Sequence, residues 1–153
     1  MIDKNGTDIK TGDIVQITGA YFKKDNATYF VARSPGDTGW SGKDYSLHKI
    51  SKRGKIAPSH NVAFWPLFVT VNDCFKRAEA KDWNREHAQI EILHTIDRAE
   101  VIEHFESESD DMAEVAKHYE WQWGTDNEST KLYRTIAKEK HAVAERIRME
   151  ESA

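Results

Sequence analysis

The sequence predicts an α+β protein in which a small antiparallel sheet, curled or closed into a barrel, is followed by a helix and a C-terminal αα-hairpin. Three observations support this class. Short β-branched and aromatic runs, separated by Gly, Pro and Asp-Asn turns, fill the chain up to about Asp97. Two long amphipathic helical patterns follow. The charge changes at the same point: residues 1–95 hold 14 Lys and Arg against 11 Asp and Glu, and residues 96–153 hold 8 against 15.

Length and composition narrow the class of protein further. The 153 residues can bury one real core, and 39% hydrophobic residues exclude general disorder. No apolar run approaches the ~20 residues that cross a bilayer, so we expect a cytoplasmic protein with no membrane partner. The single cysteine, Cys74, excludes an internal disulfide and a zinc finger. We expect a β-rich domain over residues 1–95 with one inserted helix, and a helical hairpin over residues 96–153 packed on it.

The first part of the chain predicts five short strands, because β-branched and aromatic residues suit a pleated, half-buried surface. A tip at residues 23–26 and a basic turn at residues 51–55 separate some of them. Pro66 divides the last two, which indicates an edge, a bulge or a bend there. The expected strands are residues 13–17, 28–32, 45–50, 62–65 and 67–71.

A helix of about four turns is expected from Asp73, where apolar residues recur among charged ones. Residues 89–93 either continue that helix or return to the sheet. The alternation of Ile90, Glu91 and Ile92 favours a strand.

Residues 97–100 have the spacing of a capping box, with Asp97 as the cap and Glu100 reaching back, so a helix is expected to start here. The acidic stretch at residues 106–111 interrupts its apolar stripe. Either one long helix or two helices with a kink, the second capped by Ser109, fit this pattern. The stripe consists of Ile102, Phe105, Met112, Ala116, Tyr119 and Trp123.

Gly124 is expected to end this helix, and residues 125–128 repeat the capping-box spacing. The second helix then carries its own apolar stripe, and the two stripes are expected to face each other in an antiparallel αα-hairpin. The second stripe consists of Leu132, Ile136, Val143 and Ile147.

Evidence for catalysis or metal binding is weak. The seven histidines lack metal-ligand spacing, and His87, Glu91 and His94 would share a face only if one helix ran through all three. Cys74 is expected at a strand-to-helix junction, where a helix N-terminus can activate a thiol. A small buried core residue is the favoured interpretation of this cysteine. We expect no cofactor, no metal and no catalytic residue.

The stronger signal is a set of basic residues at two predicted turns, close in sequence to two aromatic residues. Basic tips with exposed aromatics are what phosphate neutralisation and base stacking require, although such residues also serve as ordinary solubilising turns. Lys49 belongs to the same basic group. Trp121 and Trp123 cannot share a helix face, so one of them should point away from the hairpin. The predicted binding residues are Lys23, Lys24, Trp40, Lys43, Tyr45, Lys52, Arg53, Lys55 and Trp121.

Residues 10–15, with the sequence Lys-Thr-Gly-Asp-Ile-Val, resemble the opening "K-x-G-D-x-V" strand of small SH3-like barrels of the KOW and Tudor type. That resemblance covers about the first 72 residues and implies loops that bind RNA, DNA or peptide. The whole chain resembles small uncharacterised proteins of phages and mobile elements. This second resemblance implies an accessory role, including inhibition of a host defence complex of the CRISPR type.

Three hypotheses of function follow. The first is a non-catalytic binding protein that presents a bipolar surface to a protein or nucleoprotein complex. The second is direct nucleic-acid binding through the basic turns. The third is a small enzyme that uses Cys74 and one histidine. Exposed apolar residues on the two helical stripes also make a homodimer a candidate arrangement.

Overall fold

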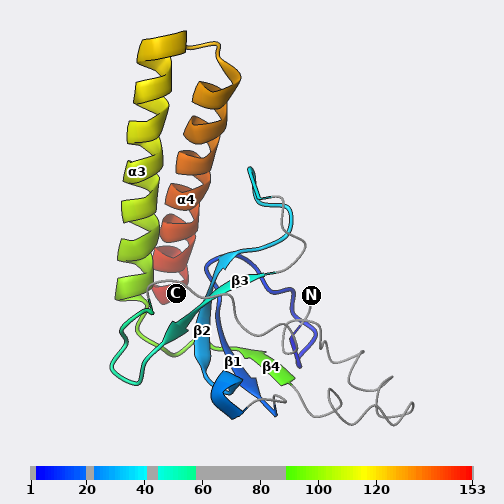
Figure 1. The fold of residues 1–153 in the computed structure, drawn as a ribbon. Coiled ribbons are helices and arrows are strands. Elements are labelled where there is room, and N and C mark those ends of the chain that lie inside the picture. The colour runs from blue at the N-terminus through cyan, green and yellow to red at the C-terminus, as the bar shows by residue number, and fades with distance from the viewer. Residues whose placement is uncertain (1–2, 20–22, 41–44, 58–88, 153) are drawn as a thin grey trace, which may run out of the picture. The chain divides into compact units, whose positions relative to one another are not determined.

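The computed structural model describes residues 3–19, 23–40, 45–57 and 89–152. It has the predicted α+β class, with a four-stranded antiparallel sheet and two long helices (Figure 1). The chain divides into two compact units. The sheet unit comprises residues 1–35 and 42–97, and the helical unit comprises residues 36–41 and 98–153. The strands expected at residues 62–65 and 67–71, the helix expected from Asp73 and Cys74 itself lie outside the described residues.

The sheet is built from β1 (Ile14–Thr18), β2 (Thr28–Arg33), β3 (Ser46–Ile50) and β4 (Gln89–Ile92). Its strand order is β3-β2-β1-β4, so the described strands form an open sheet with β3 and β4 at its edges. β4 confirms the strand interpretation of residues 89–93, because it pairs with β1 from Val15↔Ile92 to Thr18↔Gln89. β2 and β3 pair antiparallel, and Thr28 lies opposite Ile50 in this pairing.

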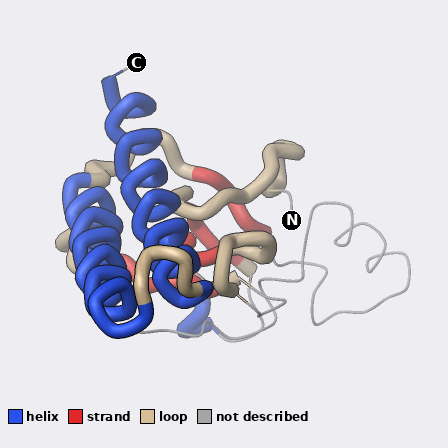
Figure 2. Tube along the Cα trace, turned by 90° about the horizontal axis from the view of Figure 1, so that it is seen from above, coloured by secondary structure: helices blue, strands red, loops and turns tan. Residues whose placement is uncertain are grey.

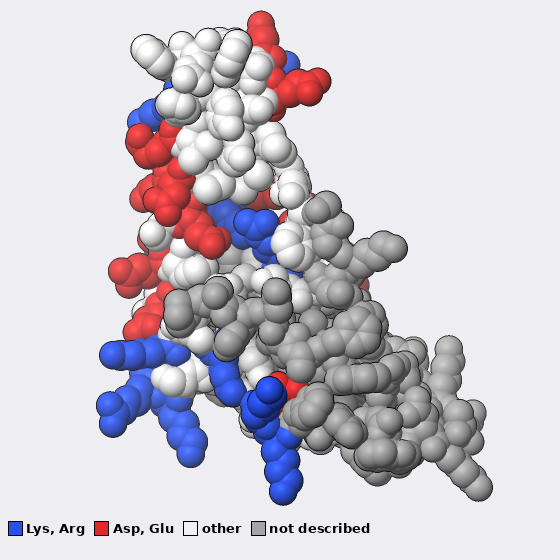
Figure 3. Space-filling model, in the orientation of Figure 1, with Lys and Arg blue, Asp and Glu red and all other residues white. Residues whose placement is uncertain are grey.

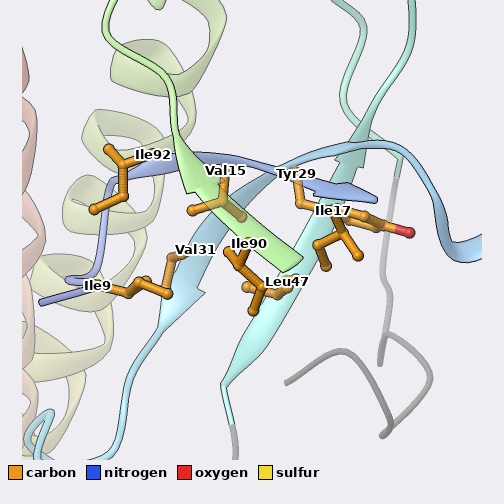
Figure 4. Packing of buried hydrophobic residues seen from close by; sticks show 8 residues of the cluster. All are labelled: Ile9, Val15, Ile17, Tyr29, Val31, Leu47, Ile90 and Ile92. Atoms are coloured by element: carbon orange, nitrogen blue, oxygen red, sulfur yellow. The ribbon is translucent and has the colours of Figure 1, made fainter. Parts of the chain in front are cut away.

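The core of the sheet unit lies on one face of this sheet. Side chains that alternate along each strand point toward one another there, as Figure 4 shows. Ile9 joins them from the segment before β1, so this segment closes one side of the core. The cluster consists of Ile9, Val15, Ile17, Tyr29, Val31, Leu47, Ile90 and Ile92.

The N-terminal segment covers the outer edge of β4. Asp3 is buried, and its carboxylate accepts hydrogen bonds from the backbone N–H groups of Asn5, Thr7 and Ile92. The Lys4 N–H donates to the Ile90 carbonyl. Backbone donors and acceptors at this edge are therefore satisfied inside the unit, where an exposed edge would invite pairing with another chain.

The helical unit contains two helices of 25 residues each, α3 (Ala99–Trp123) and α4 (Glu128–Ser152), which run alongside each other in Figures 1 and 2. α3 is one continuous helix, so the acidic stretch does not break it. Gly124 ends it as predicted, with φ +87°.

Both predicted capping boxes are wrong in position. α3 begins after Arg98, which makes no side-chain cap, and the Arg98 N–H donates to Glu151 at the end of α4. The Arg98 guanidinium also pairs with Glu150, so the residue that stands at the start of α3 contacts the other helix instead of capping its own. At the start of α4, Asn127 is the cap, because its side-chain oxygen accepts from the Ser129 N–H.

The seam between the helices uses the stripe predicted on α3 but a different stripe on α4. On α3, Val101, Ile102, Phe105 and Ala116 are buried. The Ser109 hydroxyl, expected as a cap, donates across the seam to the Ala137 carbonyl at 2.8 Å. Tyr119 stacks on Tyr133 with ring centroids 5.4 Å apart. The buried residues of α4 are Thr130, Ala137, Lys140, Ala144 and Ile147, of which only Ile147 belongs to the predicted stripe.

Leu132 and Ile136 of the predicted α4 stripe lie against Gly39. A Cβ placed on Gly39 would lie 3.0 Å from Ile136 Cδ1 and 3.6 Å from Leu132 Cδ1, and the positive φ of Gly39 further restricts this position to glycine. The Thr38 N–H and hydroxyl both donate to the Glu139 carboxylate. Residues 36–41 of the connection between β2 and β3 therefore belong to the helical unit.

Candidate functional site

The two basic turns lie at the same end of the sheet. In an antiparallel pair, the residues before one strand and after the other meet at one end, and the register Thr28↔Ile50 places the tip before β2 beside the turn after β3. The tip is a short 3-10 turn, Lys23–Asp25. Residues 51–55 form the second turn, in which the Ser51 N–H donates to the Lys55 carbonyl.

Lys49 links the two turns, because its ammonium donates to the Lys24 carbonyl at 2.8 Å. Lys49 is half-buried, whereas the other basic side chains at this end are exposed. Figure 3 shows Lys and Arg side chains gathered there. We call this surface the basic end of the sheet, and it consists of Lys23, Lys24, Lys49, Lys52, Arg53 and Lys55.

Of the aromatic residues expected beside these lysines, Tyr45 lies elsewhere in the sheet unit. Tyr45 precedes β3, at the opposite end of that strand from the turn at residues 51–55, and its hydroxyl donates to the Ile9 carbonyl. Burial and the negative charges of Asp8 and Asp13 raise the pKa of Tyr45. Trp40 belongs to the helical unit, and Lys43 lies outside the described residues. Within the described part of the sheet unit, no aromatic residue of the predicted site lies beside the basic turns.

A second charged surface runs along α3, and the sequence interpretation did not isolate it. Acidic residues three or four positions apart share one helix face, opposite the seam. Figure 3 shows Asp and Glu side chains along the helical unit. We call this surface the outer face of α3. Its members are all exposed: Glu100, Glu103, Ser107, Asp110, Asp111, Glu114, His118 and Trp121.

The basic residues of α4 do not neutralise this face. Arg134, Lys140 and Arg148 instead pair with Glu120, Glu108 and Glu106, which flank the seam. Of the outer-face acids, Glu114 is paired with Lys117 on the same helix. No cation in the described segments pairs with Glu100, Glu103, Asp110 or Asp111. The spacing of these acids, three or four residues apart, would have been enough to predict from the sequence that they share one helix face.

Two tryptophans are exposed at the end of α3 that meets the interhelical turn. Trp121 is 82% exposed and Trp123 is 67% exposed. The prediction was that one of the two would point away from the hairpin, and both are exposed. Trp123, predicted for the seam, is exposed because it occupies the last position of the helix, where α4 has not yet begun. A large exposed aromatic at the end of a charged face is typical of an interface anchor.

A buried ionic cluster lies at the seam between the helices. The Glu108 carboxylate lies 3.2 Å from His104 Nε2 and 3.3 Å from Lys140 Nζ, and the side chain of Lys140 is only 8% exposed. Burial alone would raise the pKa of Glu108, but the contacts with His104 and Lys140 outweigh it and lower this pKa to about 2. The Lys140 ammonium also lies 5.3 Å from the centroid of the Phe105 ring. This cluster lies between the helices and serves the seam.

Comparisons with known proteins return nothing similar: no family model matches the chain, and no curated protein or solved structure resembles it significantly. Over the described residues, no group of three or more His, Cys, Asp or Glu side chains could hold a metal ion. No helix among the same residues is long and apolar enough to cross a membrane. The two charged surfaces are therefore the features from which a function can be argued.

Proposed function

We propose that this chain is a non-catalytic binding protein that docks on a macromolecular partner through the outer face of α3. The observation that carries the proposal is that acidic residues and an exposed tryptophan share one helix face, while the cations of α4 pair elsewhere. A rigid helix loses little entropy on binding, and a large exposed aromatic can supply most of the binding energy.

The partner that fits this face is a protein with a basic surface. Opposite charges speed the encounter and select the partner, and Trp121 would fill an apolar pocket within that surface. The basic groove of a nucleic-acid-handling complex has this character. An acidic helix in such a groove would exclude nucleic acid, so inhibition of a host defence complex by a protein from a phage or mobile element is the specific role that we propose.

We also propose that the sheet unit is related to the SH3-like barrels of the KOW and Tudor type. The support is local and lies in the Lys-Thr-Gly-Asp-Ile-Val segment. There the Asp13 carboxylate accepts from the Lys10 N–H at 2.7 Å, and the Gly12 N–H donates to the Val31 carbonyl. The segment thus forms a tight turn that leads into β1, as the opening strand of such a barrel requires.

The test of the docking proposal is capture from a lysate of the cells in which the chain occurs, treated with nuclease. Wild type is compared with Asp110→Lys, Asp111→Lys and with Trp121→Ala. We expect a captured protein complex that resists nuclease and is lost with both variants. On the purified partner, loss of the tryptophan should weaken binding by about 2 kcal/mol, and the charge reversal by a similar amount or more.

The matched control is Asp8→Lys, Asp126→Lys, which changes the net charge equally at two exposed positions off this face. It should capture as wild type does. Circular dichroism checks that every variant keeps its helices. Capture that survives both outer-face variants, or that disappears with nuclease, would refute docking through α3.

A further inference from the structure

Six cations from three segments converge at the basic end of the sheet. Two come from the tip before β2, one from β3 and three from the turn after β3. The ladder between β2 and β3 and the bond from Lys49 to the Lys24 carbonyl hold these segments together. The cations are therefore brought together by the fold, although residues 24 and 49 lie far apart in the sequence.

The segments that carry these cations contribute little negative charge themselves. Residues 23–28 and 46–57 contain a single acidic residue, Asp25, and it is buried. A surface with several exposed cations and no exposed acid attracts polyanions, because each phosphate that it neutralises releases condensed counterions. This end is thus suited to an anionic polymer.

The chemistry of the side chains distinguishes a phosphate backbone from other anionic partners. Five of the six cations are lysines, which are depleted in protein–protein interfaces and bind phosphates as mobile point charges. Binding to a lipid surface normally adds exposed apolar side chains. The large exposed hydrophobic residues of the described chain are Trp121, Trp123, Leu132 and Met149, all of which lie in the helical unit.

We propose that the basic end of the sheet binds the phosphate backbone of nucleic acid without reading its bases. Base stacking needs exposed aromatic rings, and residues 23–28 and 46–57 offer none. The one ring within these residues is that of His48, which is half-buried and lies against Phe30 at 4.8 Å between centroids, and Tyr29, which follows the tip, is buried. The site lies wholly within the sheet unit and does not depend on the role proposed for α3.

The test is fluorescence anisotropy with labelled random-sequence DNA duplexes of about 20 base pairs, titrated at several salt concentrations. Wild type is compared with Lys52→Glu, Arg53→Glu and with Lys23→Glu, Lys24→Glu, which change different segments of the same site. We expect each double variant to bind roughly tenfold more weakly at ~100 mM salt. Each should also reduce the slope of log affinity against log salt by about 2.

The control is Lys131→Glu, Lys138→Glu, which alters net charge by the same amount at exposed positions of α4. It should retain the affinity and the salt slope of wild type, and duplexes of different sequence should bind equally. The proposal is overturned if wild type fails to bind duplex at 50 mM salt, or if the basic-end variants bind as the control does. A strong base preference, or binding to anionic lipid vesicles but not to duplex, would also overturn it.

Discussion

Glu108 is a single residue on which the charge arrangement of the helical seam depends. Its carboxylate lies 3.3 Å from the ammonium of Lys140, a lysine whose side chain is almost entirely enclosed. A buried ammonium is costly unless a partner offsets its lost hydration. His104 lies on the other side of the same carboxylate, so one acid serves two basic groups. The contact with Glu108 explains why Lys140, a charged residue, can occupy a seam position where a hydrophobic residue would be expected.

Replacement of Glu108 by Gln should destabilise the protein by about 1–2 kcal/mol at pH 7, because it leaves Lys140 buried beside a neutral amide. The effect should depend on pH. The folded-state pKa of Glu108, about 2, lies below its ordinary value of 4.5, so its contribution is complete above pH 4.5 and is lost as the pH falls toward 2. Urea unfolding of wild type and Glu108→Gln between pH 7 and pH 2 measures how the difference in unfolding free energy depends on pH.

The comparison is Glu114→Gln, which removes an exposed carboxylate from an exposed pair on the same helix. Its effect should stay within about 0.5 kcal/mol. If Glu108→Gln is equally mild at pH 7, or if its effect does not shrink as the solution is acidified, Glu108 does not stabilise the seam in this way.

At the scale of the element, the two helices approach each other over small residues of α4. Ala137 and Ala144 are buried there, and Ala144 has no exposed surface. A small residue at a helix contact leaves no room for a larger one, because protein interiors are close-packed. The seam of α4 is therefore defined by residue size more than by hydrophobicity.

Ala144→Leu should cost about 1–3 kcal/mol, because the added atoms force either the helices or their side chains apart. Ala142→Leu makes the same change two positions away on an exposed part of the helix, and should stay within about 0.5 kcal/mol. Thermal or urea unfolding of the two variants makes the comparison. Similar losses for both variants would mean that the seam does not run through Ala144.

The elements that could be predicted from the sequence are those whose pattern has one interpretation. β1 and β2 follow β-branched and aromatic runs, β3 follows an alternating pattern, and the α3 stripe follows 3-4 spacing. The α4 stripe was misassigned because Leu132 and Ile136 are apolar for another reason, namely contact with residues 36–41. The seam itself uses Thr130 and Lys140, which no hydrophobic pattern identifies.

The candidate site was predictable to a similar extent. The turns that bear Lys23, Lys24, Lys52 and Arg53 were predicted correctly, because a turn can be recognised from a few consecutive residues. That these turns share one end of the sheet depends on the pairing of β2 with β3. Tyr45 was grouped with them by its closeness in sequence, yet a strand separates its end of β3 from the basic turns. Because each strand residue adds about 3.3 Å, the length of β3 separates Tyr45 from the basic turn that follows the strand.

At the scale of the whole molecule, each charged surface lies within one unit of the chain. The basic end of the sheet belongs to the sheet unit, and the outer face of α3 belongs to the helical unit. Substitutions on residues that share no contacts usually act independently. The two binding proposals can therefore be tested separately, and variants of one surface serve as controls for the other.

The assignment of residues 36–41 to the helical unit leads to a prediction about Glu139. This carboxylate accepts from both the N–H and the hydroxyl of Thr38, so Glu139→Ala should release the segment from α4. Hydrogen exchange should then accelerate at residues 36–41 by about tenfold, with the amides of β1 and β2 unchanged. Glu145→Ala, at an exposed position on the same helix, provides the control.

Faster exchange throughout β2 and β3 in Glu139→Ala would mean that the segment is held by the sheet unit instead. Unchanged exchange at Thr38 would mean that the carboxylate does not hold it at all. Both results would contradict the division of the chain into these two units.

The same segment has a consequence for synthesis on the ribosome. Thr38 is synthesised 101 residues before Glu139, and Gly39 likewise precedes Leu132 and Ile136, which lie against it. This segment must therefore wait for the synthesis of α4 before it can dock. A C-terminal fragment starting at Arg98 would lack this segment, and would expose an apolar strip on α4 that favours aggregation.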